Sequence, residues 1–477
     1  MSHHEAIPEG TDKFRDTISL IDDSGERNWV YAKKPKGKLH TARSFFGYSL
    51  IFFLFLGPFI KINGHPFILL DILSRKFILF GFPFWPQDLP LLGLILITGV
   101  VAVILFTVMF GRLWCGWSCP QTVFMELFFR KIEFMIEGDF NEQKKLDASP
   151  WTTEKIFKKT LKHIIFYTLS VFIANIFLAY IIGADELLKL ITDGPIVHWG
   201  QLLSLIIFST VFYFVFAKFR EIICIVVCPY GRLQGLMLDN NSLVVAYDFV
   251  RGEPRGAIRK NETTQHGDCI DCKRCVQVCP TGIDIRNGTQ LECVNCTACI
   301  DECNDVMTKI KRPNGLVRFA SQEQIVNGTQ HAVSFRSVAY VAILFVLIGA
   351  SVYFVSTRKD ISTAILRTPG MLYQEQDSLH VSNMYNFDVI NKTFTEQQID
   401  IKIVEPITAE LKMVDRKLSH IQLGEDSLAK GSFFIILPRD KIISNNSEIK
   451  FQIWSNGVLI DELKTNFIGP VKLNSTK

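Results

Sequence analysis

Several features that mark common classes of protein are absent from this chain of 477 residues. It has no sustained block of Lys and Arg and a net charge of only +4, so we expect no nucleic-acid partner. It also lacks a C-x-x-C-H haem motif, a Walker loop and a clear dinucleotide fingerprint. Any electrons that the chain carries must therefore come from a protein or a quinone. No cleaved signal peptide is expected either, because the first apolar run begins only at Phe45.

Apolar residues make up 48% of the chain and charged residues 21%, a balance that predicts membrane and soluble parts together. Five nearly uncharged stretches are long enough to cross a bilayer. They are Phe45–Ile62, Leu89–Phe110, His163–Ile182, Trp199–Phe219 and Val338–Ser356.

The placement of Lys and Arg predicts the orientation of these stretches. Positive residues are frequent before the first stretch and after the second, whereas the connection Gly183–His198 holds only Lys189. Because positive loops stay in the cytoplasm, we expect the N-terminus and Lys218–Arg336 to be cytoplasmic. The chain after Ser356 is then exported across the cell inner membrane.

Eight cysteines form two runs, CIDCKRCVQVCP at 269–280 and CVNCTACIDEC at 293–303. Each has the spacing C-x2-C-x2-C-x3-C, in which three close thiolates hold one 4Fe-4S cluster and the fourth reaches the other cluster. Zinc sites use paired cysteines, and disulfides do not persist in the cytoplasm. We expect one cluster on Cys269, Cys272, Cys275 and Cys303, and the other on Cys293, Cys296, Cys299 and Cys279.

The remaining cysteines lie in two C-x3-C-P motifs, RLWCGWSCPQ at 112–121 and REIICIVVCPYG at 220–231. They are Cys115, Cys119, Cys224 and Cys228. Both motifs follow a membrane stretch, which suggests two related hairpins of spans that bring the motifs to the same depth. Soft sulfur ligands of this kind select Cu(I), zinc or an iron-sulfur cluster.

The proline of each motif predicts the local structure around the second cysteine. Proline suits the first position of a helix, so helices are expected to begin at Pro120 and Pro229. Cys119 and Cys228 would then lie near N-caps, where the helix dipole and nearby arginines should favour the thiolate.

The exported tail contains alternating strand patterns. EIKFQIW at 448–454, the turn at Asn456 and Gly457, and VLIDELK at 458–464 form a hairpin signal, and QIDIKIV and SFFIILP add strands. We interpret the tail as an immunoglobulin-like β-sandwich. The expected fold is thus a multi-domain membrane protein with a five-span α-helical transmembrane bundle, an inserted α+β ferredoxin-like domain and a C-terminal all-β immunoglobulin-like domain.

The expected segments follow from these assignments. They are the cytoplasmic segment 1–44, the four-span domain with the first motif 45–219, the second motif with a linker 220–260, the two-cluster ferredoxin-like domain 261–312, the linker 313–337, the fifth span 338–356 and the exported domain 357–477.

Taken together, these motifs resemble the CcoG/FixG/RdxA family of cytochrome c oxidase accessory proteins, which are polyferredoxin-type membrane proteins. The resemblance covers nearly the whole chain and includes RKFILFGFPFWPQD at 75–88, GRLWCGWSCPQTVFMELFFRKIE at 111–133 and CPYGRLQG at 228–235. It implies a cupric reductase that binds copper and reduces Cu(II) to Cu(I) for assembly of a cbb-type cytochrome c oxidase. Under the same resemblance, the cysteines of the C-x3-C-P motifs are the copper or thiol-redox positions, and the eight ferredoxin cysteines carry electrons.

Two other functions remain open. One is a NapH-like quinol-linked electron-transfer subunit, and the other is a non-catalytic copper chaperone or assembly scaffold. The exported domain favours the accessory family over the first, and the eight cluster cysteines argue against the second. The expected partners are the oxidase or its copper-delivery factors, an unknown electron donor that is a protein or quinol, membrane lipid, and a second copy of the chain in a homodimer.

The paired cysteine runs predict that the reduced protein shows the EPR signals of two 4Fe-4S centres. Iron analysis of an anaerobic preparation should give about eight irons per chain, four for each cluster. A content of about four irons or fewer would contradict the assignment.

Overall fold

The computed structural model describes residues 27–62, 64–72, 76–193, 199–239, 241–257, 266–328, 335–414, 420–442 and 446–470. The predicted boundaries 44/45 and 356/357 lie within these ranges, and the boundary 260/261 lies outside them. The chain forms two compact units. Met1–Ile60 with Gly93–Ser351 make up the first, and Lys61–Leu92 with Val352–Lys477 make up the second.

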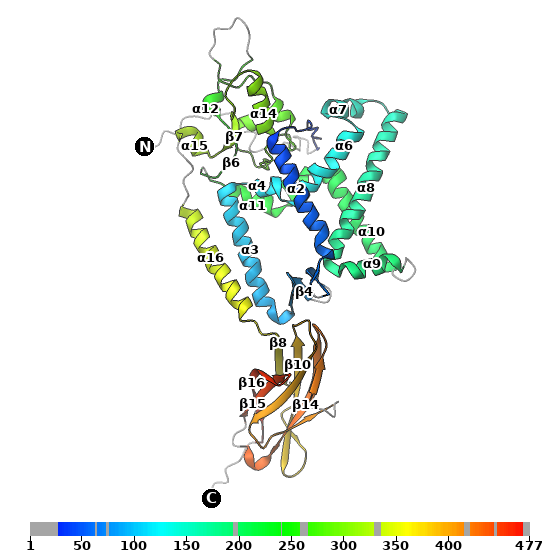
Figure 1. Cartoon of the computed structure of the whole chain (residues 1–477), viewed down its shortest axis with the longest axis vertical. Coiled ribbons are helices and arrows are strands. Elements are labelled where there is room, and N and C mark those ends of the chain that lie inside the picture. The colour runs from blue at the N-terminus through cyan, green and yellow to red at the C-terminus, as the bar shows by residue number, and fades with distance from the viewer. Residues whose placement is uncertain are drawn as a thin grey trace. The chain divides into compact units, whose positions relative to one another are not determined.

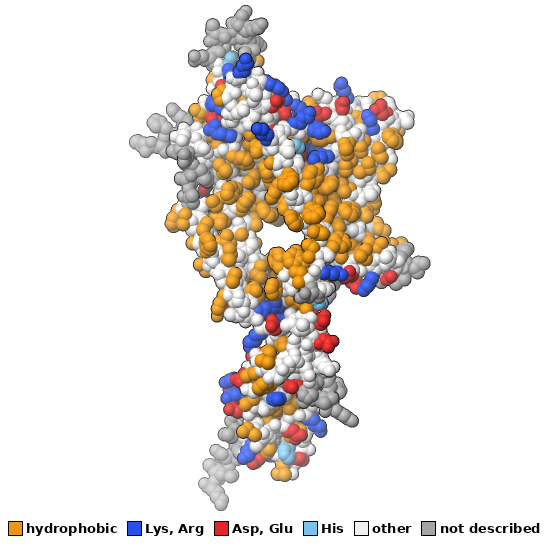
Figure 2. All heavy atoms as spheres, viewed as in Figure 1, with side chains coloured by type: hydrophobic (Ala, Val, Ile, Leu, Met, Phe, Trp, Pro, Cys, Tyr) orange, Lys and Arg blue, Asp and Glu red, His pale blue; other side chains and the backbone are white. Residues whose placement is uncertain are grey.

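Five helical runs are long and apolar enough to cross a membrane, as predicted. They are α2 (Lys38–Leu56) with η1 (Gly57–Phe59), α3 (Leu89–Phe110) with η2 (Pro86–Asp88), α8 (Thr153–Ile182), α10 (Trp199–Phe214) with η4 (Val215–Phe219), and α16 (Phe335–Ser356), as Figure 1 shows. Hydrophobic side chains cover their outer faces in Figure 2, and Phe45, Leu96 and Phe345 are each more than half exposed. An apolar outer face of this kind suits contact with lipid rather than water.

The fourth predicted span has the bounds of its helical run, and the other four differ, most of all the first and the third. The first helical run ends at Phe59, because Pro58 lies at its end and the chain then enters strand β1 (Lys61–Ile62). The third begins at Thr153, ten residues before the predicted His163, with the Thr152 hydroxyl accepting a hydrogen bond from the backbone N–H of Lys155. The early start brings the lysines that precede the apolar run into the helix.

Shorter helices connect the spans. They are α4 (Leu113–Trp117), α5 (Pro120–Phe124), η3 (Met125–Phe129), α6 (Arg130–Ile136), α7 (Phe140–Ala148), α9 (Ala184–Thr192), η5 (Ile223–Val227) and α11 (Pro229–Met237). Helices α5 and α11 begin at Pro120 and Pro229, and their N-caps are Cys119 and Cys228, which confirms the local prediction. An aromatic core holds the bundle together, with the ring of Phe129 stacked on that of Phe216 at 4.5 Å between centroids.

The cysteine-rich segment folds between two short antiparallel strands, β6 (Val244–Tyr247) and β7 (Val317–Ala320). Its helices are α12 (Phe249–Gly252), α13 (Arg274–Gln277), η6 (Ile285–Asn287), α14 (Ala298–Lys309) and α15 (Gln322–Asn327). Val245, Met307 and Val317 are buried in one core with the cysteines. The packed segment therefore extends beyond 261–312 on both sides.

The tail is a two-sheet sandwich, as predicted. One sheet has the order β12 (Glu410–Met413), β14 (Leu428–Pro438), β10 (His380–Asn391), β8 (Ile361–Arg367), with β9 (Gln374–Glu375) paired to β10; the other has the order β13 (His420–Leu423), β11 (Gln397–Glu405), β15 (Asn446–Ser455), β16 (Val458–Ile468). The 3-10 turn η7 is Arg439–Lys441. Tyr385, Phe433 and Phe451 are fully buried between the sheets. The turn at Asn456 and Gly457 has positive φ at both residues, as the hairpin signal requires.

The connection between the first two spans packs in the same unit as the sandwich. Its strands are β1, β2 (His65–Pro66), β3 (Ile68–Asp71), β4 (Lys76–Leu79) and β5 (Phe82–Phe84). The buried carboxylate of Asp88 binds Arg358 at 2.7 Å and Lys392 at 2.6 Å, and the indole N–H of Trp85 donates to Asp426 at 2.9 Å. These contacts fix the connection against the tail.

The buried position of Asp88 predicts a large effect of Asp88→Asn, which leaves two cations without their carboxylate. We expect this change to cost about 3 kcal/mol, since removing one partner of a buried ion pair leaves an uncompensated charge. Hydrogen exchange of 76–92 should then become roughly a hundredfold faster. The matched change Asp388→Asn, at an exposed pair with Lys430, should leave exchange unchanged. Equal exchange in the two variants would contradict the expectation.

Candidate iron-sulfur and thiol site

The eight ferredoxin cysteines surround two enclosed spaces of similar size. The first, which we name the far cavity, has a volume of about 380 Å³ and is lined by Cys269, Cys272, Cys275 and Cys303. The second, the near cavity, has a volume of about 350 Å³ and is lined by Cys279, Cys293, Cys296 and Cys299, with Cys275 also at its edge. The lining of each cavity contains the four cysteines assigned to one cluster from the spacing.

Matching backbone geometry makes the two cavities. Asp271 and Lys273 in the first run, and Asn295 and Thr297 in the second, all take positive φ between +51° and +66°. Such left-handed turns turn successive N–H groups toward one point, where they favour an anionic group. Non-glycine residues adopt this geometry at a cost that is typical of functional sites.

The chemistry of the cavity walls fits a 4Fe-4S cluster in each. The thiols are buried among apolar side chains, and burial raises the pKa of Cys293 and Cys303 to about 12. Protons must therefore leave these thiols when iron binds, as for any thiolate ligand. A bound cluster supplies one-electron transfer.

The other four cysteines lie in or next to the short helices α4, α5, η5 and α11, and we name them the thiol quartet: Cys115, Cys119, Cys224 and Cys228. The Cys115 thiol donates to the Gln234 amide oxygen at 3.1 Å, and the Arg112 guanidinium donates to the same oxygen and to the Gly231 carbonyl. A Cβ on Gly231 would overlap the Cys224 carbonyl oxygen, so glycine permits the close approach of α11 and η5. The two motifs thus come together, as their matched spacing predicts.

The expectation that a helix start favours the thiolate at Cys119 and Cys228 is wrong for Cys119. Burial raises the pKa of Cys115 to about 11 and that of Cys224 to about 12, and it also raises the pKa of Cys119. Arg112 lowers the pKa of Cys115, but by less than burial raises it. These thiols are therefore protonated until a metal displaces the proton.

The thiol quartet is not arranged around one ion. In the part of the chain that the structure describes, no three His, Cys, Asp or Glu side chains are placed to hold a single metal ion. A 4Fe-4S cluster differs because each thiolate binds a different iron, so its ligands lie further apart. Binding one copper ion at the thiol quartet would require its side chains to move together.

Direct packing joins the thiol quartet to the near cavity. Cys115 packs against the cluster formed by Val278, Val294, Cys296 and Ala298. A Cβ on Gly116 would overlap the Val294 carbonyl oxygen, and the Gly116 carbonyl accepts a hydrogen bond from Arg43 Nε at 2.7 Å. The Cys115 side chain is therefore in direct contact with residues that line the near cavity.

The ferredoxin-like segment is also fastened to the first span. Both oxygens of Asp301 accept backbone hydrogen bonds at the start of α2, from Leu39 at 3.3 Å and His40 at 2.8 Å. A carboxylate at a helix N-terminus stabilises the helix through its unpaired N–H groups and its dipole. The neighbouring Glu302 binds Lys33 at 2.6 Å. In Figure 1 the start of α2 accordingly lies beside α14.

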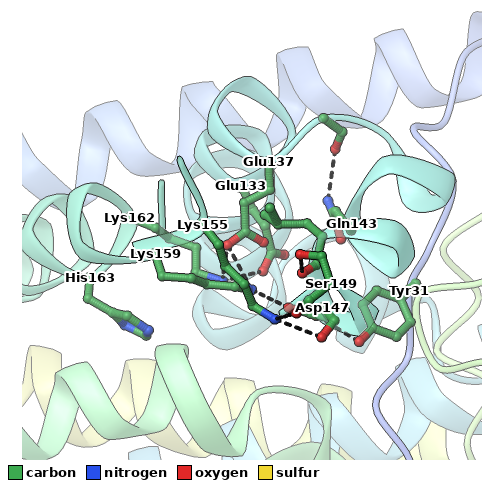
Figure 3. A network of polar contacts seen from close by, with 12 residues as sticks. Tyr31, Glu133, Glu137, Gln143, Asp147, Ser149, Lys155, Lys159, Lys162 and His163 are labelled. Atoms are coloured by element: carbon green, nitrogen blue, oxygen red, sulfur yellow. Dashed lines mark hydrogen bonds and ion pairs between the residues drawn. The ribbon is translucent and has the colours of Figure 1, made fainter. Parts of the chain in front are cut away.

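An ionic network that sequence reasoning missed lies between α6 and α8. Glu137 binds Lys159 at 3.0 Å and Lys162 at 2.8 Å, and Figure 3 shows these side chains pointing toward one another. Burial favours the neutral form of Glu133, but Arg220, Lys162 and Arg130 together lower its pKa to about 2. Glu133 therefore stays ionised and binds Arg220 at 2.9 Å.

The lysines of segment 144–159 differ in their exposure. Lys144 and Lys145 are exposed, but Lys155 is only 6% exposed and donates to the carbonyls of Asp147 and Ser149. The available signal was that the acids lie four residues apart on one helix and the lysines lie three or four residues apart on the next, so that each set shares one face of its helix.

Family models match three parts of the chain. Residues 219–322 match a 4Fe-4S dicluster domain, residues 92–136 match a 4Fe-4S binding domain, and residues 351–470 match the immunoglobulin-like fold at the C-terminus of FixG. Together with five helices that are long and apolar enough to cross a membrane, these matches define the class as a multi-pass membrane protein with 4Fe-4S domains.

Three known proteins are similar to much of the chain. RdxA of Cereibacter sphaeroides is 39% identical over 302 residues, covering 61% of this chain and 62% of RdxA. The nitrogen fixation protein FixG of Rhizobium meliloti is 36% identical, covering 62% of this chain and 58% of FixG. RdxB of Cereibacter sphaeroides is 29% identical, covering 90% and 93%. The chain thus spans about six tenths of RdxA and FixG, and these similarities support the resemblance to the FixG/RdxA family that the motifs predict.

The contact at Gly116 predicts that Gly116→Ala separates the thiol quartet from the near cavity, because the added methyl group has no space beside Val294. Cys115 should then react at least several times faster with a maleimide in an anaerobic sample, measured by mass spectrometry. The control Gly99→Ala adds a methyl group where no atom lies within 4 Å. Equal labelling of Cys115 in both variants would show that the contact does not protect it.

Proposed function

We propose that this protein passes electrons from two 4Fe-4S clusters to the thiol quartet, where Cu(II) is bound and reduced to Cu(I) for a cbb-type cytochrome c oxidase. The packing of Cys115 against Val294 and Cys296 supports the proposal most strongly. It gives electrons a short route from the near cavity to the thiols. The oxidase or its copper-delivery factors would receive the product.

The thiols supply a chemical reason for the direction of the reaction. Sulfur binds Cu(I) better than Cu(II), so binding at the thiol quartet favours reduction of the metal. Each Cu(II) accepts one electron, and each thiol that becomes a ligand releases its proton. The buried walls around Cys115 and Cys224 limit the access of water to the reduced ion.

For the orientation, we propose a cytoplasmic N-terminus and ferredoxin-like segment, with an exported tail. The ion pairs of Asp88 support one part of this arrangement, since they tie the first connection to the tail and so favour the same side of the membrane for both. The distribution of Lys and Arg supports the choice of side.

A second function is favoured by one specific observation. The family model of a 4Fe-4S binding domain covers 92–136, a range in which Cys115 and Cys119 are the only cysteines. In this alternative, the thiol quartet holds a third 4Fe-4S cluster, and the chain is an electron relay that does not act on copper. The arrangement of the thiols, which does not suit a single ion, agrees with this alternative.

Two double variants separate the proposals, Cys115→Ser with Cys119→Ser, and Cys224→Ser with Cys228→Ser. If copper binds there, both variants should lose stoichiometric copper binding, and the rate of Cu(I) formation should fall at least tenfold. The iron content should stay at about eight per chain. A third cluster would instead give about twelve irons, falling to about eight in the variants.

The control Cys272→Ser changes a cysteine of the far cavity and should lower the iron content while the thiol quartet is intact. Reduction of Cu(II) at the unmutated rate in both double variants would rule out the thiol quartet as the copper site.

A further inference from the structure

A third cavity, which we name the interfacial cavity, lies between the thiol quartet and the ferredoxin-like segment. Its empty space, which includes the open space at its mouth, is about 340 Å³. Gln121, Met125, Arg220 and Cys224 line it from the membrane domain, and Thr281 and Val294 line it from the ferredoxin-like segment. No function described above uses this space.

Several segments with unusual backbone geometry lie at this cavity. Three π-helical segments, η3, η4 and η5, converge on it through Met125, Arg220 and Cys224. Arg220 has φ of +49°, a strained conformation for a residue with a side chain. Both π-turns and such strain are common at functional sites, because the surrounding fold must maintain them.

Two buried nitrogen atoms in the cavity wall, Arg220 Nε and Gln121 Nε2, have no hydrogen-bond partner among the described residues. Arg220 Nε lies 3.8 Å from Glu221 Oε1, beyond hydrogen-bond distance. The Arg220 side chain is only 3% exposed, and its other nitrogens bind Glu133. An unsatisfied buried donor costs about 1–3 kcal/mol, so the wall favours a ligand with two oxygen acceptors. The carboxylates of Glu126 and Glu221 in the same wall disfavour an anion.

The location suits a lipid-soluble electron donor. Arg220 directly follows the fourth span, so the cavity lies where the hydrocarbon of the bilayer ends. On its other side, the Thr281 hydroxyl lies 3.3 Å from the Cys279 sulfur, which lines the near cavity. Met125, Pro280 and Val294 provide apolar walls.

We propose that the interfacial cavity binds the head group of a membrane quinol, which is the electron donor to the near cavity. The two quinol oxygens pair with Arg220 and Gln121. Oxidation breaks both O–H bonds, gives two electrons singly to the two clusters, and releases two protons to water past Glu126 and Glu221. The inference rests on the electron-transfer part of the proposed function and not on copper.

The test runs the electron transfer in the favourable reverse direction. Full-length protein in lipid nanodiscs is reduced with dithionite, and the excess dithionite is removed. The reduced protein is then mixed anaerobically with decyl-benzoquinone while the absorbance of the clusters is followed. We expect re-oxidation that saturates with quinone. Gln121→Leu should raise the half-saturating concentration about tenfold, the effect of one lost hydrogen bond, and Gln201→Leu, on the exposed start of α10, should not.

Two controls separate a binding defect from a folding defect. Ferricyanide, which needs no quinone site, should re-oxidise every variant at the same rate. Omission of copper from this assay is the second control, so failure of the copper proposal and failure of this one are distinguishable. Re-oxidation that never saturates with quinone, or identical half-saturation in Gln121→Leu and the unmutated protein, would overturn the proposal and leave water as the occupant.

Discussion

The backbone contact between Gly116 and Val294 determines how closely the thiol quartet approaches the near cavity. One side of this contact belongs to the three residues between Cys115 and Cys119, and the other to the loop that holds Cys293 and Cys296. Glycine is required because any Cβ would meet a carbonyl oxygen. Arg43 from the first span and Asp301 from α14 hold the two sides in place. The redox centre is thus positioned by backbone packing and a helix cap rather than by a flexible linker.

The ionic network between α6 and α8 also keeps the bundle rigid, although burying its charged groups costs free energy. Glu133, Lys162 and Arg220 are each less than 10% exposed, and buried charges are tolerated only when each has partners. Such pairs contribute little net stability compared with apolar packing, but they allow few alternative arrangements. Here they fix the end of the fourth span, where Arg220 and Glu221 precede the second cysteine motif.

Residue spacing predicted a large part of this molecule. The spans followed from apolar length, the helix starts from Pro120 and Pro229, and the tail strands from alternating residues and an Asn-Gly turn. These are local signals, in which a short stretch determines its own structure. Predicting the cysteines that line each cavity required only one more rule, that the fourth cysteine of each run binds the cluster of the other run.

Features that depend on burial were not predictable in the same way. The raised pKa of Cys115 depends on the burial that other segments impose, which outweighs the opposite effect of Arg112. The role of Lys155 depends on the end of α7, which lies beside it only after folding. Likewise, nothing near Gln121 or Arg220 in the sequence indicates a shared cavity, because the other wall comes from Thr281 and Val294.

The ion pairs of Asp88 have a consequence for the order in which the chain assembles. Their partner Arg358 lies 270 residues later, and the partner of Trp85, Asp426, lies 341 residues later. At a synthesis rate of about 5–20 residues per second, the ribosome needs roughly 15–70 s to make those partners. Throughout that interval the connection between the first two helices has been made but lacks its docking surface. The connection that precedes the second helix therefore cannot reach its final contacts until the β-sandwich has emerged from the ribosome.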